Sequence, residues 1–451
     1  MLTSTNPVSP YTNWFTAATN IQNAIDAASP GDFIVVSNGV YQTGGQIVYG
    51  DAMNRVALNE PITVMSVNGP SVTTIMGNVY PEYEYGTRCA YVTNGATLAG
   101  FTLSSGNIGY GSDYHDFDGA GVYSESGGMV SNCVISGNSV YTEGEGGGAF
   151  GGTLVNCIIT GNSVPENGDV TTIGGGVYNA TLVDCLLTGN SAGGYGGGAD
   201  GCTLDNCTII GNSAAVGGGT AFCAVNNSID CSNSCNSAYG FSPNYVAGSI
   251  AAGYASFSYS CTTPAAGGIG DIANDPALVN PAGGDYQLQS NSPCINSGDN
   301  IQVTTATDLA GNPRIVGGTV DMGAYEYQTP ASVISYAWLQ QYGLPTDGSV
   351  DFADLDGTGF TVYQDWVAGL DPTNGASVLK MLPPTVANTI PGIVVSWESS
   401  SGIDYNIQRS VSLTSVFTTI QSNIVGQAGT TSYTDTNAVG NGPYFYRVGV
   451  Q

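Results

Sequence analysis

The stretch NCTIIGNSAAVGGG, residues 206–219, contains the repeat unit that decides the fold. A cysteine comes first, with an apolar residue two positions later, an asparagine five positions later, and then a glycine triplet. The pattern Asn/Asp-Cys-x-(Ile/Leu)-x-Gly-Asn-Ser occurs four times at intervals of 24, 28 and 22 residues, around Cys133, Cys157, Cys185 and Cys207. Four copies at a nearly constant period indicate a repeat architecture.

Each copy has apolar residues three positions before and two positions after its cysteine. Alternate residues of a strand point to the same face, and a period of 22–28 residues with Gly/Asn corners is typical of a parallel β-helix with one coil per repeat. We therefore expect the Cys, Leu and Ile positions in the core and the asparagines in a ladder at a turn. The first apolar positions are Val130, Leu154, Leu182 and Leu204, the asparagines are Asn138, Asn162, Asn190 and Asn212, and the triplets start at Gly146, Gly174, Gly196 and Gly217.

The repeat extends in both directions, and its cysteine slot accepts other residues. Leu98, Phe101 and Leu103 match the pattern upstream, and Val225, Ser228 and Asn233 match it downstream. A slot that takes Phe, Cys or Ser is selected for packing and not for thiol chemistry. The glycine triplets lack the GK[ST] of a phosphate-binding loop and recur in every coil, so we interpret them as corners.

The beginning of the chain predicts a cap for this solenoid, since an open coil would expose its core and unpaired strand edges. Ile21, Ala24, Ile25 and Ala28 have helical spacing and precede Pro30-Gly31, which predicts an amphipathic capping helix. The segment FIVVSNGVY, residues 33–41, is then expected to be a strand of an early coil.

Two later motifs, SPCINSGDN (292–300) and DLAGNPRIVGGTVDMGAYEYQ (308–328), resemble the closing segment of the choice-of-anchor Q group. Together with the repeats, residues 10–328 resemble secreted bacterial proteins of the pectin-lyase-like superfamily. The resemblance implies a mainly β, right-handed parallel β-helix and a secreted or surface-attached protein. That group has no single established activity.

Residues 336–374 form a different module that contains a candidate calcium loop. Oxygen ligands stand at loop positions 1, 3, 5, 7 and 12, with glycine at position 6, as in an EF-hand. They are Asp354, Asp356, Thr358, the carbonyl of Phe360, and Asp365. The segment resembles dockerin-like or thrombospondin-like repeats, but Thr358 and the short Asp365 predict weak Ca²⁺ binding, about 0.1–1 mM. An acidic turn without an ion is the alternative.

Residues 381–451 alternate as short strands and predict a β-sandwich that resembles a fibronectin type III domain, with Trp397 and Tyr405 in its core. We therefore predict three parts: a capped β-helix over 1–328, an EF-hand-like segment over 329–380 and the sandwich over 381–451.

The charge balance excludes several classes of partner. The chain has 34 acidic residues against six Lys and Arg, for a formal net charge of −28. Its basic residues are scattered, so neither nucleic acid nor an anionic membrane surface has a basic patch to bind. No apolar run approaches the ~20 residues of a membrane span. The amino terminus lacks signal-peptide features, and the Lys-poor, acidic composition leads us to expect a secreted or cell-surface protein whose signal was removed.

The acidic loops hold the candidate catalytic residues. A lyase base would have to come from Arg55, Arg88 or Arg314, because residues 1–328 contain no lysine. A hydrolase needs two carboxylates, and the best group lies in GSDYHDFDG, residues 111–119. Its members are Asp113, His115, Asp116 and Asp118, with the corner acids Glu143, Glu145, Glu166 and Asp169 nearby in the repeat. Converging acids would make a hydrolytic cleft or a calcium site; separate acidic loops are the alternative.

Eleven cysteines, an odd number, leave at least one unpaired, and no C-x-x-C pair supports zinc. Disulfide candidates lie toward the irregular end, at Cys202, Cys223, Cys231, Cys235, Cys261 and Cys294, with the pairing open. The leading hypothesis is a noncatalytic extracellular structural or adhesive protein, with itself or extracellular glycans as partner. The alternative is a carbohydrate-active enzyme that acts in a groove of the β-helix, more readily a polysaccharide hydrolase than a lyase.

Overall fold

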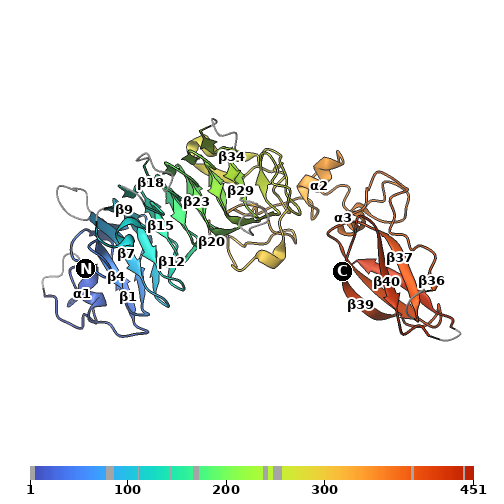
Figure 1. Ribbon diagram of the computed structural model, residues 1–451, viewed down its shortest axis with the longest axis horizontal. Helices are drawn as coiled ribbons and strands as arrows, with labels where there is room; N and C mark the ends of the chain where they lie inside the picture. Colours follow the sequence, from blue (N-terminus) through green and yellow to red (C-terminus); the bar gives the residue numbers. More distant parts are fainter. Residues whose placement is uncertain are drawn as a thin grey trace. The chain divides into compact units, whose positions relative to one another are not determined.

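A computed structural model describes residues 6–77, 86–109, 111–141, 144–165, 172–236, 242–246, 256–386, 391–439 and 442–450. The chain divides into two compact units, Met1–Pro330 and Ala331–Gln451. Strands dominate both units (Figure 1). This division does not separate the predicted segment 329–380 from the predicted sandwich, so the three-part division stays a prediction.

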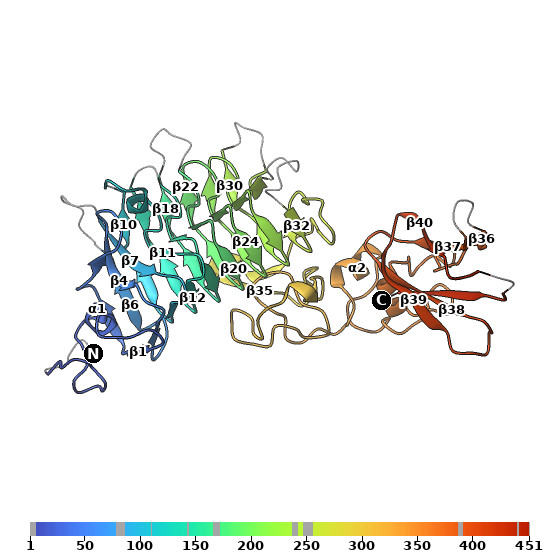
Figure 2. The same ribbon diagram turned by 60° about the horizontal axis from the view of Figure 1, so that its bottom comes forward.

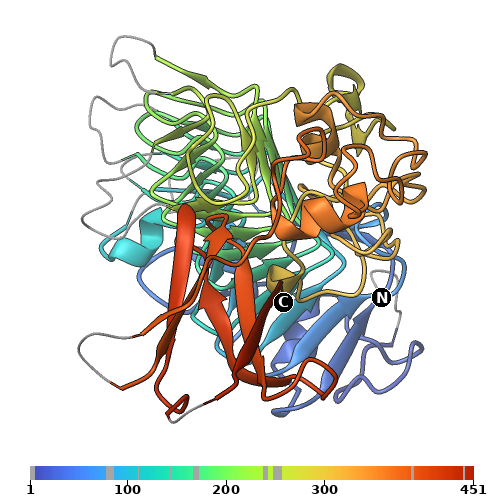
Figure 3. The same cartoon turned by 90° about the vertical axis from the view of Figure 1, so that its right-hand side faces the viewer.

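The first unit consists of long parallel sheets, which fit a β-solenoid (Figure 2). Along the first sheet lie β1 (Phe33–Val36), β5 (Thr63–Ser66), β8 (Thr97–Ala99), β12 (Met129–Ser131), β16 (Thr153–Val155), β20 (Thr181–Val183), β24 (Thr203–Asp205), β28 (Ala224–Asn226) and β32 (Ser256–Ser258). Along the second lie β2 (Gly39–Tyr41), β6 (Thr73–Met76), β9 (Thr102–Ser104), β13 (Val134–Ser136), β17 (Ile158–Thr160), β21 (Leu186–Thr188), β25 (Thr208–Ile210), β29 (Ile229–Cys231) and β33 (Cys261–Thr262). Successive coils overlay one another along the long axis (Figure 3).

A third sheet completes the coils and turns around β7 (Gly86–Val92). One arm contains β10 (Asn107–Ile108), β14 (Ser139–Val140), β18 (Ser163–Val164), β22 (Ser191–Ala192), β26 (Ser213–Ala214) and β30 (Ser234–Cys235). The other contains β11 (Val122–Ser124), β15 (Ala149–Phe150), β19 (Val177–Tyr178), β23 (Ala199–Asp200), β27 (Thr220–Ala221) and β31 (Tyr245–Val246). Strands β3 (Gln46–Ile47) and β4 (Met53–Leu58) add to β7, and β10 pairs with β7 antiparallel.

Strand pairing places equivalent residues of the repeat on successive rungs. Leu154 pairs with Val130 on one side and Leu182 on the other, so one repeat makes one coil, as predicted. The cysteines of the repeat are buried in the main core. The asparagines form a continuous ladder. Each side-chain amide donates to the side-chain oxygen of the asparagine on the next coil, for example Asn162 to Asn190 Oδ1 at 3.0 Å.

The predicted helix near the amino terminus is shorter than its pattern suggested. Helix α1 covers Ile21–Ile25, and the Asn20 side chain accepts the backbone N–H of Asn23 at its start. Both isoleucines belong to the main core. The Gln22 side chain accepts the backbone N–H of Ala57 at 2.8 Å, so the helix satisfies backbone of β4. The predicted strand 33–41 is divided into β1 and β2.

The segment after the last coil turns back over the second sheet. It includes β34 (Leu278–Asn280), η4 (Pro281–Gly283), β35 (Asp285–Leu288) and η5 (Asn300–Gln302). We call residues 285–327 the closing strap. The strap donates backbone N–H groups to the sheet, from Gly323 to the Asn227 carbonyl at 2.7 Å and from Ala324 to the Thr208 hydroxyl at 3.0 Å.

The second unit contains two antiparallel sheets that fit a β-sandwich. One is formed by β36 (Thr385–Val386), β37 (Ile393–Ser399) and β40 (Gly429–Asp435), the other by β39 (Thr418–Val425), β38 (Asp404–Ser410) and β41 (Phe445–Val450). Trp397 and Tyr405 are buried between strands with ring centroids 5.7 Å apart, as predicted. Helices α2 (Tyr336–Gln341) and α3 (Val362–Ala368) precede the sheets. Among the described helices none has the length and hydropathy of a membrane span.

Candidate functional sites

The acidic cluster of residues 111–119 folds into a short 3-10 helix, η1 (Tyr114–Phe117). Asp113 caps this helix and its carboxylate contacts His115 Nδ1. Donation from the His115 backbone N–H and its ring lowers the pKa of Asp113. The imidazole lies between Tyr114 and Tyr49, with centroids 3.9 and 4.5 Å away. This packing and the contact with Asp113 hold the imidazole ring in place.

Asp116 is fully buried and engaged in holding two loops together. Its Oδ1 accepts the backbone N–H groups of Asp51 and Ala52 at 2.8 and 2.7 Å. Its Oδ2 accepts the backbone N–H of Asp113 at 3.1 Å. A carboxylate with three backbone donors is organised as a structural anchor and not as an available acid or base.

Asp118 lies on a different side of the cluster and is brought next to Glu145. The two residues form a parallel β-bridge, so they are neighbours on adjacent coils. Asp118 is 6% exposed, and burial together with the charge of Glu145 raises the pKa of its carboxyl to about 7. Burial also raises the pKa of Glu145. The predicted neighbours Glu143, Glu166 and Asp169 lie outside the described residues.

A further buried acid, Asp200, lies within electrostatic range of Glu145 and was not predicted from the sequence. Two positions after the four glycine triplets stand Phe150, Tyr178, Asp200 and Ala221. Asp200 is 4% exposed and its Oδ2 has no hydrogen-bond partner in the described residues. Burial and the nearby charge of Glu145 raise its pKa to about 7. The spacing from the triplets was the signal that could have revealed it.

Aromatic rings fill the same outward position on the preceding coils. The Tyr91 and Tyr123 rings are stacked at 6.1 Å, Tyr123 and Phe150 at 4.8 Å, and Phe150 and Tyr178 follow at 5.6 Å. In such a stack, the face of each ring is covered by the ring of the neighbouring coil. This ladder of ring-to-ring contacts stabilises the stacking of the coils.

The candidate calcium loop has its acids close together but no entering helix, since α2 ends at Gln341, well before Asp354. Asp354 accepts the N–H groups of Gly357 and Gly359 at 2.8 and 3.0 Å, which curls the loop. The Thr358 hydroxyl donates to Asp356 Oδ1 at 2.8 Å. These contacts define a tight acidic turn, and the helix–loop–helix of an EF-hand is not formed in this described stretch.

Two oxygens of this loop lack donors. Asp356 Oδ2 and Asp365 Oδ1 are buried and without hydrogen-bond partners in the described residues. Burial and the charges of Asp356, Asp354 and Asp371 raise the pKa of Asp365 to about 6. Across the described ranges, however, no group of three or more His, Cys, Asp or Glu side chains is arranged to hold a metal ion. The loop thus fits a weak cation site only if the hydroxyl and backbone oxygens of Thr358 and Phe360 contribute.

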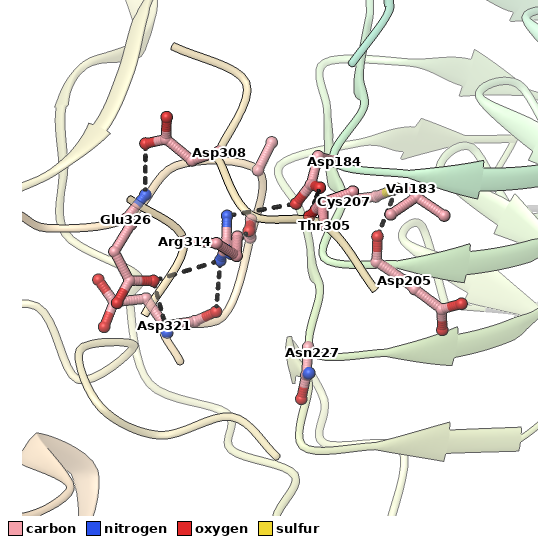
Figure 4. Close-up of polar contacts among 12 residues, drawn as sticks. Val183, Asp184, Asp205, Cys207, Asn227, Thr305, Asp308, Arg314, Asp321 and Glu326 are labelled. Carbon is pink, nitrogen blue, oxygen red and sulfur yellow. Dashed lines mark hydrogen bonds and ion pairs between the residues drawn. The ribbon is translucent and has the colours of Figure 1, made fainter. Parts of the chain in front are cut away.

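The closing strap carries a buried ionic network to the solenoid (Figure 4). Arg314 lies 3.4 Å from Asp184 of the coil and 3.5 Å from Glu326 of the strap. Its guanidinium donates to the carbonyl of Asp321 at 2.9 Å. Burial raises the pKa values of Asp184, Asp321 and Glu326 to about 6, 7 and 8. Because two buried carboxyl groups, those of Asp184 and Glu326, pair with one cation, this junction is sensitive to charge, and Arg314 is structural here.

Comparisons with protein-family models, curated proteins and solved structures gave no match to this chain.

Proposed function

We propose that the chain is a noncatalytic extracellular or cell-surface protein in which a right-handed β-helix serves as a rigid structural or adhesive element. The main support is the state of Asp116, the central acid of the best catalytic cluster, whose oxygens accept three backbone N–H groups. The other regular side chains of the solenoid bond or stack from coil to coil. These roles favour rigidity over turnover.

The proposed partners are other copies of the chain and extracellular glycans. A net charge of −28 opposes close approach of two copies, and a divalent cation would screen that repulsion. We propose that the loop at 354–365 binds Ca²⁺ weakly through Asp354, Asp356, Thr358, the Phe360 carbonyl and Asp365. The two donor-free buried oxygens support this assignment, since a cation would satisfy both.

Size-exclusion chromatography and negative-stain images, each with Ca²⁺ and with EDTA, test self-assembly. We expect the chain to form larger assemblies in Ca²⁺ at high protein concentration and to lose them in EDTA. A monomer under both conditions at high concentration would rule self-assembly out. An Asp365→Asn variant should lose the Ca²⁺ response while keeping its fold.

One observation favours a second function, a polysaccharide hydrolase. The charges of Glu145, Asp200 and Asp118 all act on Tyr178, whose pKa burial raises first and these charges raise further. Two of these acids have pKa values near 7, the range of a general acid. Activity from this cluster would be present near pH 6, would decline above pH 7, and would disappear in Asp118→Asn. Activity that is unchanged in this variant would exclude the cluster as its source.

A further inference from the structure

The outward side of the first sheet is a long face with almost no charge. Among the nine strands from β1 to β32 the one charged residue is Asp205, and its carboxylate accepts the side-chain amide of Asn226 at 2.8 Å. Asp32, which precedes β1, uses its carboxylate to accept the backbone N–H of Ser29 at 2.8 Å. We call the outward residues of these strands the first-sheet face. It is uncharged over most of its length in a chain that has 34 acidic residues.

The first two strands of this face expose large apolar side chains. Phe33 and Val35 of β1 are 72% and 47% exposed. Met65 of β5, which pairs in register with Val35, is 38% exposed, and Val67 directly after β5 is 51% exposed. We call these four residues the apolar patch. Contiguous apolar side chains that remain exposed in this way mark an interaction surface.

Beyond the patch the face continues as rows of uncharged side chains. Strand pairing places one such row in register, and its members are Thr97, Met129, Thr153, Thr181 and Thr203. Covering this row does not require an ion to be removed from water, which is the most unfavourable step in burying a polar surface. Sheets with faces of this kind pack on one another about 10 Å apart.

The second sheet shows how a similar face is used within the molecule. Its outward residues Thr208 and Ile229 occupy successive rungs and are each 1% exposed. The closing strap lies on them: the Ala324 N–H donates to the Thr208 hydroxyl at 3.0 Å, and a Cβ at Gly323 would stand 2.8 Å from Ile229 Cδ1. An uncharged face of this solenoid thus accepts polypeptide. The apolar patch of the first sheet is left exposed by the described residues.

Charge identifies the occupant of the first-sheet face. A basic partner would bind the acidic loops of the chain in preference to a face without charge. A second copy carries the same net charge of −28, so the uncharged face is the surface where two copies approach with the least repulsion. We propose that two copies pack their first-sheet faces together, with the apolar patch of each copy in the contact. This inference rests on the proposed self-association and names the surface that carries it.

The size of the face sets the strength of the contact. Nine strands spaced ~4.8 Å apart span ~38 Å, and three residues of strand give a width of ~10 Å, so the face covers about 400 Å² per copy. That is about half of the ~800 Å² per partner in a standard stable interface. The dimer is therefore expected to be weak and to form at high protein concentration. Phe33, the most exposed member of the patch, is expected to contribute most.

Sedimentation velocity of the full chain in Ca²⁺, over a series of protein concentrations, tests this surface. Phe33→Glu places an acid in the patch of both copies and should raise the dimer Kd at least about tenfold. Ile301→Glu is the matched control, because Ile301 is 87% exposed in the closing strap and the variant gains the same charge. It should change the dimer Kd by less than about twofold. If Phe33→Glu loses the circular dichroism signal of the fold, Met65→Glu on the neighbouring strand takes its place.

The outcomes separate this surface from self-association in general. A wild type that stays monomeric at every concentration in Ca²⁺ would overturn both. A wild type that dimerises, with equal Kd values for Phe33→Glu and Ile301→Glu, would leave self-association standing and overturn this surface. If Phe33→Glu abolishes sedimentation with an insoluble polysaccharide and leaves the dimer unchanged, the face binds glycan, and the proposed contact between copies is wrong.

Discussion

Replacing Asn190 by alanine removes one rung of the asparagine ladder in the middle of the solenoid. The side-chain oxygen of Asn190, Oδ1, accepts hydrogen bonds from the backbone N–H and from the side-chain amide of Asn162, both at 3.0 Å. Its amide donates to the Ile159 carbonyl and to the Asn212 side chain, both at 2.9 Å. All of these groups are buried, so water cannot replace the lost bonds without opening the coil.

The size of the stability loss follows from the buried groups that lose their hydrogen-bond partners. Two buried donors of Asn162 lose their acceptor, and each unsatisfied buried donor costs about 1–3 kcal/mol. The expected loss in the free energy of unfolding of the first unit is therefore about 4 kcal/mol. Thr160→Ala is the matched control, because Thr160 points outward on the adjacent coil, that of Asn162, and should change stability by less than ~0.5 kcal/mol.

Urea unfolding measures this effect in the full chain. Three of the four tryptophans, Trp338, Trp366 and Trp397, lie in the second unit, so their fluorescence mainly follows that unit while far-UV circular dichroism also follows the solenoid. We expect a lower midpoint for the solenoid transition and an unchanged midpoint for the fluorescence transition. If the free energy of unfolding of the first unit falls by less than about 1 kcal/mol, other groups or water can replace the ladder bonds, contrary to this prediction.

Three further predictions concern charge. Arg314→Met should leave the buried carboxyl groups of Asp184 and Glu326 without their cation, cost about 3–5 kcal/mol, and speed hydrogen exchange in residues 285–327; unchanged exchange would contradict it. The raised pKa of Asp200 means that the folded state binds its proton more tightly than the unfolded state, so stability should fall between about pH 4 and pH 7. Asp200→Asn should remove up to about 3 kcal/mol of the part of this fall that denaturation at pH 5 and pH 8 measures; an identical pH profile would contradict it. Asp356→Asn should weaken Ca²⁺ binding at least about tenfold in calorimetry, while Asp347→Asn in the neighbouring exposed turn should not; equal weakening by both would exclude the loop.

The solenoid could be predicted because each coil repeats the same pattern of core residues and turn residues. The slot of Leu154 and Leu182 and the rung of Asn162 and Asn190 recur at a fixed spacing, and parallel pairing turns that spacing into stacking. The short η1 helix and the anchoring of Asp116 could not be predicted in this way. They depend on backbone N–H groups of residues 51 and 52, which no periodicity connects to position 116.

The junction between the closing strap and the coils was marked in the sequence by a departure from the repeat, but this departure had more than one explanation. Asp184 occupies the position before the repeat cysteine where the other copies have Asn132, Asn156 and Asn206. The structure gives the reason: this one coil meets Arg314, and a carboxylate can pair with it. Without knowing where the strap returns, an Asn-to-Asp change in a repeat is indistinguishable from ordinary variation. Departures from a repeat thus marked the contact but could not identify its partner.

The most direct test of a noncatalytic role combines binding and turnover in one sample. The full chain is incubated with a panel of extracellular polysaccharides in Ca²⁺, and co-sedimentation and newly released reducing ends are measured together at pH 6 and pH 8. We predict that the protein sediments with at least one insoluble polysaccharide and that no reducing ends are released at either pH. Reducing ends that appear with the wild type and are absent with Asp118→Asn would contradict it.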